Sequence, residues 1–284
     1  MPITFTRKEV PYHHWELLDI DSCDRIRIVP ERGGLITEWF CNGREVLYFD
    51  YERFNQIGQS VRGGIPILFP ICGNLPGNSW KSGNHEYRLP QHGFSRDLPW
   101  KIDFMHHDKC CVLSLCDNEA SRAMYPYSFL VEIKFKLEIN AINFLINIEN
   151  RSKEKMPFSF GMHPYFNVTD LGKIEVDGLP SKCINHLNML EDDTKKQLAV
   201  ISDGIDFICG PSKLVTVVDL LTRTRVHLQQ QEPMNLTVLW TDPPRKMICL
   251  EPWTSPRESL INGERILLLE PGAIQKLDCR LMTD

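Results

Sequence analysis

Alternating apolar and polar residues dominate the middle of the chain. Every second residue from Phe129 to Ile139 is apolar, and lysines and glutamates occupy most positions between them. A period of two is typical of a half-buried antiparallel β-strand. The alternation resumes over Ile142–Glu149, after Asn140-Ala141, which can turn the chain. The two segments therefore predict a β-hairpin.

Further short runs of apolar and β-branched residues are separated by turn signals such as Asn42-Gly43 and Asn262-Gly263. The strands predicted from these runs are Arg25–Val29, Leu35–Phe40, Glu45–Phe49, Cys111–Cys116, Leu214–Leu220, Thr224–Gln229, Leu236–Trp240, Lys246–Glu251, Arg265–Leu269 and Ile274–Leu281. Helical signals are confined to Asn118–Met124 and Pro256–Ile261, and the charged run Glu191–Lys196 is predicted as a solvated loop. Many short strands with few helices favour an all-β sandwich or barrel. Because no linker or shift in composition interrupts the pattern, we expect one domain over residues 1–284.

Charge and hydropathy limit the partners that we expect. The net charge is −5, and the basic residues form no cluster of the kind that binds nucleic acid or an anionic membrane. The first residues contain no apolar stretch long enough for a signal peptide, and no later run could span a bilayer. We therefore expect a cytoplasmic protein with neither a nucleic acid nor a membrane as partner. Nothing in the pattern specifies an oligomeric state.

The ten cysteines do not indicate a metal site or a disulfide framework. No Cys-x-x-Cys pair occurs, and without a secretory signal reduced thiols are expected. The run His106–Cys111 contains candidate ligand types, but adjacent residues of a strand point to opposite faces. We interpret this run as a polar hairpin turn that leads into the next strand.

Four segments depart from the alternating pattern. The first is rich in proline and glycine, so it is not an ordinary central strand, and its flanking Arg62 and Asn74 could point into a cavity. Each of the others places one ionisable residue among apolar neighbours beside glycine or proline: His92, His163 and Glu251. Burial of such groups is costly without a role. The four segments are Arg62–Pro76, Leu89–Arg96, Phe158–Asn167 and Ile248–Pro256.

The motifs RGGIPILFP, HGFSR, GMHPYFN and LEPW, in this order, resemble the galactose mutarotase-like superfamily. The similarity is greatest to the branch of aldose 1-epimerase-related proteins and glucose-6-phosphate 1-epimerases, and it extends from about Asp24 to Leu281. The resemblance implies a single large antiparallel β-sandwich, in agreement with the strand pattern. In place of the Asn-Arg pair of typical galactose mutarotases the early loop has Gly73-Asn74-Leu75, which argues against galactose as the substrate.

The resemblance also implies residue roles. His92 and His163 match the two active-site histidines of the family, and Glu251 matches its catalytic glutamate. Arg62 and Arg96 match substrate-binding arginines, and Asp203 is our match for the acidic substrate ligand. Trp253 could stack on the apolar face of a sugar, or it could simply pack in the core.

Interconversion of α and β anomers requires opening of the hemiacetal ring. One group removes the proton from the C1 hydroxyl, and another protonates the ring oxygen, so a carboxylate and an imidazole suffice without metal or cofactor. We expect Glu251 to be the base, His163 the acid, and His92 a hydrogen-bond donor to the sugar. Two alternatives stay open. The substrate could be a hexose 6-phosphate held by arginine forks, or the chain could be a non-catalytic sugar-binding module.

Overall fold

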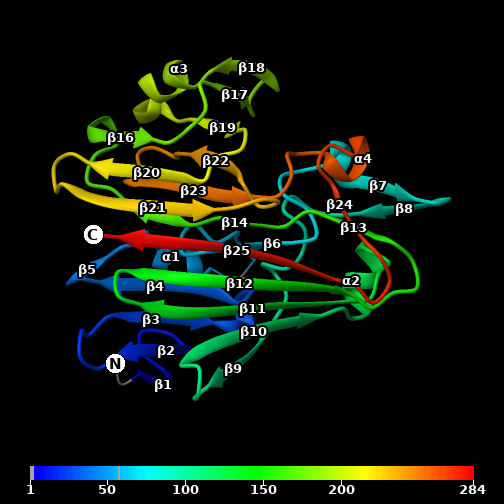
Figure 1. Ribbon diagram of the computed structural model, residues 1–284, viewed down its shortest axis with the longest axis horizontal. Helices are drawn as coiled ribbons and strands as arrows, with labels where there is room; N and C mark the ends of the chain where they lie inside the picture. Colours follow the sequence, from blue (N-terminus) through cyan, green and yellow to red (C-terminus); the bar gives the residue numbers. More distant parts are fainter. Residues whose placement is uncertain (1–2, 57) are drawn as a thin grey trace.

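A computed structural model describes residues 3–56 and 58–284, and strands dominate it (Figure 1). The three longest strands are β11 (Phe129–Glu138), β12 (Ala141–Asn150) and β25 (Ile274–Thr283), with ten residues each. In the same described ranges no helix exceeds six residues. The all-β class predicted from the alternating pattern is confirmed.

One eight-stranded sheet contains the three longest strands, and we call it the long-strand sheet. Its order is β16-β20-β21-β25-β12-β11-β10-β9, and all its neighbouring pairs are antiparallel. Its other strands are β9 (Lys101–Met105), β10 (Cys110–Cys116), β16 (Ile174–Asp177), β20 (Leu214–Asp219) and β21 (Thr224–Gln230).

The second eight-stranded sheet, here the site sheet, has the order β18-β17-β19-β22-β23-β14-β6, and β15 also pairs with β23. Its strands are β6 (Ile67–Leu68), β14 (Gly161–Met162), β15 (Tyr165–Asn167), β17 (Lys182–Asn185), β18 (Leu190–Asp193), β19 (Asp206–Cys209), β22 (Leu236–Trp240) and β23 (Met247–Trp253).

Smaller elements complete the described chain. A five-stranded sheet consists of β1 (Ile3–Lys8), β2 (His14–Asp19), β3 (Arg25–Val29), β4 (Leu35–Cys41) and β5 (Arg44–Glu45). Two-stranded sheets pair β7 (Ser79–Ser82) with β8 (His85–Arg88) and β13 (Met156–Phe158) with β24 (Leu267–Leu269). The helices are α1 (Tyr51–Phe54), α2 (Glu119–Met124), α3 (Thr194–Ala199) and α4 (Ser259–Asn262), with 3-10 turns η1 (Pro30–Arg32), η2 (Pro76–Asn78), η3 (Leu171–Lys173) and η4 (Ile201–Asp203).

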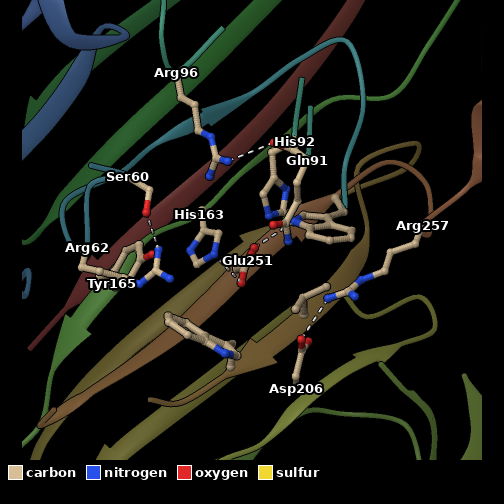
Figure 2. Close-up of a pocket in the computed structure, with 13 residues that line it drawn as sticks. Ser60, Arg62, Gln91, His92, Arg96, His163, Tyr165, Asp206, Glu251 and Arg257 are labelled. Carbon is tan, nitrogen blue, oxygen red and sulfur yellow. Dashed lines mark hydrogen bonds and ion pairs between the residues drawn. The ribbon is translucent and has the colours of Figure 1, made fainter. Parts of the chain in front are cut away.

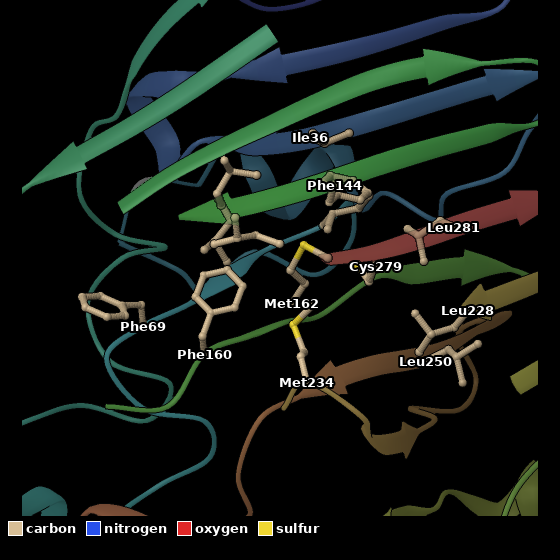
Figure 3. Close-up of a cluster of buried hydrophobic side chains, with 14 of the residues drawn as sticks. Ile36, Phe69, Phe144, Phe160, Met162, Leu228, Met234, Leu250, Cys279 and Leu281 are labelled. Carbon is tan, nitrogen blue, oxygen red and sulfur yellow. The ribbon is translucent and has the colours of Figure 1, made fainter. Parts of the chain in front are cut away.

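The main hydrophobic core lies between the long-strand sheet and the site sheet (Figure 3). Phe144 on β12 and Leu281 on β25 belong to the same buried cluster as Met162 on β14 and Leu250 on β23. Burial of each such side chain stabilises the fold by about 1.5–3 kcal/mol. Since one face of the site sheet is covered in this way, its opposite face is left to form a binding surface.

Most predicted strands are present, with shifted ends, and three details of the prediction are wrong. The hairpin of β11 and β12 turns at Ile139 and Asn140, because Ala141 already pairs with Glu138. The charged run Glu191–Lys196 is not a loop. It lies in β18 and α3, where Asp193 caps the helix by accepting from the backbone amides of the first turn. The interval Glu45–Phe49 forms only isolated bridges after Glu45.

Two interpretations of cysteine-rich segments agree with the structure. Residues 106–109 form the turn between β9 and β10, which pair in register from Cys110 to Ser114. All ten cysteines are free thiols.

None of the helices within residues 3–56 and 58–284 has the length and apolar character needed to cross a bilayer.

Candidate functional site

Strand β23 places Glu251 on the face of the site sheet that turns away from the main core. Ile248 and Leu250 belong to the main core, whereas Cys249 and Trp253 belong to separate clusters on the other face. Because successive side chains of a strand point to opposite faces, Glu251 lies with Cys249 and Trp253. The same alternation puts Trp240 of β22 and Asp206 of β19 beside the site.

A cavity of about 280 Å³ opens on this face (Figure 2). It is lined by Ser60, Arg62, Gln91, His92, Arg96, His163, Tyr165, Asp206, Val238, Trp240, Glu251, Trp253 and Arg257. His92, His163 and Glu251, which come from three separate segments of the sequence, therefore meet in one place. The volume suits a single small ligand rather than an extended polymer.

Glu251 and His163 are in direct contact at the base of this cavity. His163 Nε2 lies 3.2 Å from Glu251 Oε1, and Trp253 Nε1 donates to Glu251 Oε2 at 3.1 Å. Glu251 is 1% exposed and His163 8%. Burial, together with the nearby Asp206, raises the pKa of Glu251 well above its ordinary value. Burial and Arg96 lower the pKa of His163, so over a wide pH interval the pair holds one proton between its two groups.

The ring of His163 is oriented by its neighbours. It stacks on Tyr165 with centroids 4.7 Å apart and an interplanar angle of 14°, and the edge of Trp240 packs against it. His163 Nδ1 is buried and has no hydrogen-bond partner among the described residues. The ring is thus fixed by packing, while its Nε2 meets the carboxyl group.

His92 is held in a tight turn. Its φ is +66°, its amide donates to the Gly73 carbonyl at 2.6 Å, and the Gly73 amide donates to His92 Nδ1 at 3.1 Å. Because Nδ1 accepts, the neutral ring carries its proton on Nε2, where it can donate to a ligand. Burial, Arg96 and His163 keep the pKa of His92 well below its ordinary value. The next residue, Gly93, also has a positive φ, and a Cβ there would collide with the Phe69 carbonyl.

Three arginines border the cavity. Arg62 and Arg96 point toward the His163 side, and Arg257 lies on the opposite side beside Asp206 (Figure 2). Arg62 donates to Ser60 Oγ at 3.3 Å and lies over the Trp240 ring at 5.4 Å. Arg96 donates to the Gln91 carbonyl at 2.9 Å. These contacts leave guanidinium N–H groups facing the cavity, which therefore favours an anionic or hydroxyl-rich ligand.

Besides Glu251, the acidic residue that lines the cavity is Asp206, and the predicted Asp203 does not line it. Asp203 is exposed in η4, at the Gly204 turn, and is not among the residues that line the cavity. Asp206 is the first residue of β19 and precedes the apolar run Phe207–Cys209, whereas Glu251 follows an apolar run, so each is an ionisable residue at one end of such a run. Asn74 does not line the cavity either, but it accepts from Arg257 at 3.4 Å and so borders the site indirectly.

Sequence reasoning also missed Arg257, whose side chain links two walls of the site. Its Nη2 donates to Asp206 Oδ2 at 2.9 Å. Its neighbours in the sequence are polar residues and a proline, which are typical of an exposed segment and do not single it out: Ser255-Pro256-Arg257-Glu258. Phe94, which could have offered an aromatic face to a ligand, lies instead in the main core against Phe129.

One group of potential metal donors occurs in the site. Atoms of His163, Cys249 and Glu251 lie within 4.8 Å of one another, and all three residues are buried. The geometry is nevertheless that of a proton-sharing pair, because His163 Nε2 and Glu251 Oε1 are at hydrogen-bond distance. Burial raises the pKa of the Cys249 thiol well above its ordinary value, which disfavours the thiolate that a metal would need. The residues therefore fit acid–base chemistry better than metal binding.

Comparison with known proteins places this geometry in context. The family model described as aldose 1-epimerase matches residues 26–281. A curated relative from Salmonella typhimurium, named "Putative glucose-6-phosphate 1-epimerase", is 29% identical over 178 residues. That match covers 61% of this chain and 54% of the relative, so the chain spans about half the length of that curated relative in the match.

Solved structures resemble the whole chain. The crystal structure of the Slr1438 protein from Synechocystis sp. PCC 6803 has a TM-score of 0.92 and 33% identity, covering 100% of this chain and 99% of that one. A galactose mutarotase-like protein from Clostridium acetobutylicum has a TM-score of 0.80 at 19% identity, covering 99% and 98% of the two chains. The similarity to the second structure supports the fold and nothing further, and this fold is the large antiparallel β-sandwich described above.

Proposed function

Because the chain belongs to the aldose 1-epimerase family, we propose that it interconverts the α and β anomers of a hexose by acid–base opening and closure of the sugar ring. The observation that carries this proposal is the buried contact of 3.2 Å between His163 Nε2 and Glu251 Oε1 inside the cavity. A pair that shares one proton can give a proton to one oxygen of a hemiacetal and take one from the other.

We assign the steps as follows. The reacting form of the pair has the shared proton on His163 Nε2 and Glu251 as the carboxylate. Glu251 removes the proton from the C1 hydroxyl, His163 protonates the ring oxygen, and the bond between C1 and the ring oxygen breaks to give the open-chain aldehyde. Rotation about C1–C2 presents the other face of the aldehyde, and reclosure returns both protons. His92 donates from Nε2 to the sugar, and Asp206 accepts from a hydroxyl group on the opposite side. Neither electrons nor a leaving group enter the balance, so these residues need no cofactor.

In this proposal Trp253 acts mainly through its indole N–H and not by stacking on the sugar. Its indole N–H donates to Glu251 Oε2, and its ring packs at 5.7 Å from that of His92. The residue thus holds the base in place, and it also supplies apolar surface to the cavity.

The test is a mutarotation assay with freshly dissolved α-glucose, followed by polarimetry and corrected for the spontaneous reaction. Acceleration by the protein, lost in the Glu251→Gln variant, would support the proposal. A protein that binds glucose without accelerating its mutarotation would instead be a sugar-binding module. The direct acid–base contact argues against that function, because binding alone does not need a proton-sharing pair.

A hexose 6-phosphate is the second candidate substrate. Three guanidinium groups border the cavity. Arg257 lies 2.9 Å from Asp206, and Arg62 Nε lies 4.0 Å from Asp242, which does not line the cavity. Arg62 and Arg96 on the other wall could bind phosphate oxygens as forks. The name of the Salmonella typhimurium relative points the same way. If this substrate is correct, kcat/KM for glucose 6-phosphate exceeds that for glucose, and Arg62→Ala reduces the difference. Equal values in the wild-type protein would favour the free sugar.

A further inference from the structure

His186 is a buried histidine beside the site that the acid–base steps above do not use. It follows β17, is 7% exposed, and does not line the cavity. Its Nδ1 lies 2.6 Å from Asp206 Oδ1, and its amide donates to the Asp206 carbonyl at 2.8 Å. Two separate contacts therefore tie this residue to the first position of β19.

Both carboxylate oxygens of Asp206 are held by protein donors. His186 occupies Oδ1, and Arg257 Nη2 donates to Oδ2 at 2.9 Å. A carboxylate has about four lone-pair sites, so two are left for a ligand. Since χ2 of an aspartate is otherwise a soft torsion, the two donors fix the direction in which the remaining lone pairs face the cavity.

His186 also contacts the residue that holds the proposed base. Its ring stacks on the Trp253 indole with centroids 5.9 Å apart and an interplanar angle of 23°. Trp253 in turn donates to Glu251 Oε2 at 3.1 Å. The His186 side chain thus contacts Asp206 itself and the residue that holds Glu251, on two strands of the site sheet that β22 separates.

We propose that His186 is a positioning residue, which orients the Asp206 carboxylate toward the sugar and fixes the Trp253 indole against Glu251. This proposal rests on the proposed epimerase function. It gives His186 two separable effects. Its hydrogen bond acts on sugar binding through Asp206, and its ring acts on turnover through Trp253 and the base.

The protonation states agree with this assignment. Burial lowers the pKa of His186, so the ring is neutral and donates from Nδ1 to the acceptor-only carboxylate. His186 Nε2 is then a buried acceptor without a partner among the described residues, as is Nε2 of His14, so the hydrogen bonding of His186 acts through Nδ1. Burial alone would raise the pKa of Asp206, but His186 and Arg257 more than offset it, and the pKa is lowered.

Two variants separate the two effects. His186→Phe keeps a flat ring on Trp253 but removes the donor. His186→Asn places an amide near the position of Nδ1, so it can still donate to Asp206, but it lacks the ring. We expect His186→Phe to raise KM for glucose or glucose 6-phosphate roughly 10- to 100-fold, the range for a hydrogen bond to a charged group, with little change in kcat. We expect His186→Asn to keep KM and to lower kcat.

A pH profile distinguishes positioning from general destabilisation. The Kd of the sugar is measured by calorimetry in a Glu251→Gln background, which removes the titration of the base. Loss of the His186 donor raises the pKa of Asp206, so the weakening of binding at low pH begins at a higher pH in Glu251→Gln/His186→Phe. Besides Glu251, which the background variant removes, the titratable or charged groups that act with Asp206 are His163, Cys249 and Arg257, and both proteins retain these three.

The matched control is His14→Phe. His14 is 2% exposed, lies in β2 outside the cavity, and also has a 2.6 Å contact from Nδ1, to the Tyr12 carbonyl. The His14→Phe variant should have a lower melting temperature, but its KM and the pH dependence of its sugar binding should be those of the wild-type protein. If His186→Phe and His186→Asn change KM, kcat and the pH profile no more than His14→Phe does, the proposal is wrong. Wild-type protein without turnover would overturn the proposed function, whereas active wild-type protein with an unchanged His186→Phe would overturn only the role of His186.

Discussion

Replacement of Glu251 by glutamine tests the site most directly, because it removes the proton acceptor and keeps the shape. The amide can accept from Trp253 Nε1 with its oxygen and donate toward His163 Nε2 with its nitrogen, so both contacts of the carboxyl group have a substitute. The other residues that line the cavity, among them Asp206 with its proposed role as acceptor of a sugar hydroxyl, are unchanged. The variant should therefore bind sugar nearly as well as the wild-type protein does.

The expected loss is in kcat. A positioned general acid or base is worth roughly 10²–10⁴-fold, which corresponds to about 3–5 kcal/mol in the activation free energy. Mutarotation of glucose is followed by polarimetry. Mutarotation of glucose 6-phosphate is followed by coupling the reaction to a dehydrogenase that accepts one anomer. The Kd of the sugar is measured separately by calorimetry. An unchanged kcat would refute Glu251 as the base, and a loss that appears only in Kd would make it a binding residue.

The same variant has an effect on stability whose sign follows from the pKa of Glu251. Burial raises this pKa in the folded state above the unfolded value of about 4.3. Between the two values the folded state binds more protons, so the free energy of unfolding decreases as pH rises through this interval. Glu251→Gln lacks this term. It should be stabilised relative to the wild-type protein at pH 8, and the difference should shrink toward pH 4 in chemical denaturation. A difference that grows toward low pH would contradict the buried, protonated carboxyl group.

Three further predictions follow from the geometry. His163→Asn should lower kcat roughly as much as Glu251→Gln does, by about 10²–10⁴-fold. His92→Asn should act mainly on KM, because the role proposed for His92 is only to donate a hydrogen bond to the sugar. Exhaustive chelation should leave mutarotation unchanged, and activity that returns only with one divalent ion would overturn the metal-free mechanism. Gly93→Ala should destabilise the protein by more than about 1 kcal/mol, measured as a lower midpoint of denaturation, because φ is positive and the Phe69 carbonyl occupies the place of the new Cβ.

The sequence by itself determined the fold class and the longest strands, β11, β12 and β25, but not short strands of the site sheet such as β6, β14 and β15. The period of two over Phe129–Ile139 indicates a strand with one buried and one exposed face, because only in such a strand do all its apolar residues lie on the covered side. The hairpin of β11 and β12 follows from the local pattern and the turn residues. Its turn lies one residue earlier in the structure than in the prediction. The expectation of one domain over residues 1–284 and the cytoplasmic location stay predictions.

The sequence was also sufficient to select three ionisable residues in unusual apolar surroundings, and the family resemblance supplied their roles. It could not show that His92, His163 and Glu251 meet, since they are brought together by pairing among β6, β14 and β23 and by the turn at Gly93. The charged run of β18 and α3 was misread for a related reason. Thr194 is the one buried residue of this edge strand and capped helix, so their composition resembles that of a loop.

Only the tertiary structure placed Asp206 and Arg257 in the cavity and His186 beside it. The choice between Asp203 and Asp206 depends on the face to which each side chain points, and three residues separate an exposed 3-10 turn from a strand that faces the cavity. Arg257 and His186 acquire their importance from contacts with Asp206 that span 51 and 20 residues of sequence. Local pattern records whether a residue is buried, but the partner of a buried polar group is set by the packing of distant strands, and no short window of sequence contains that information.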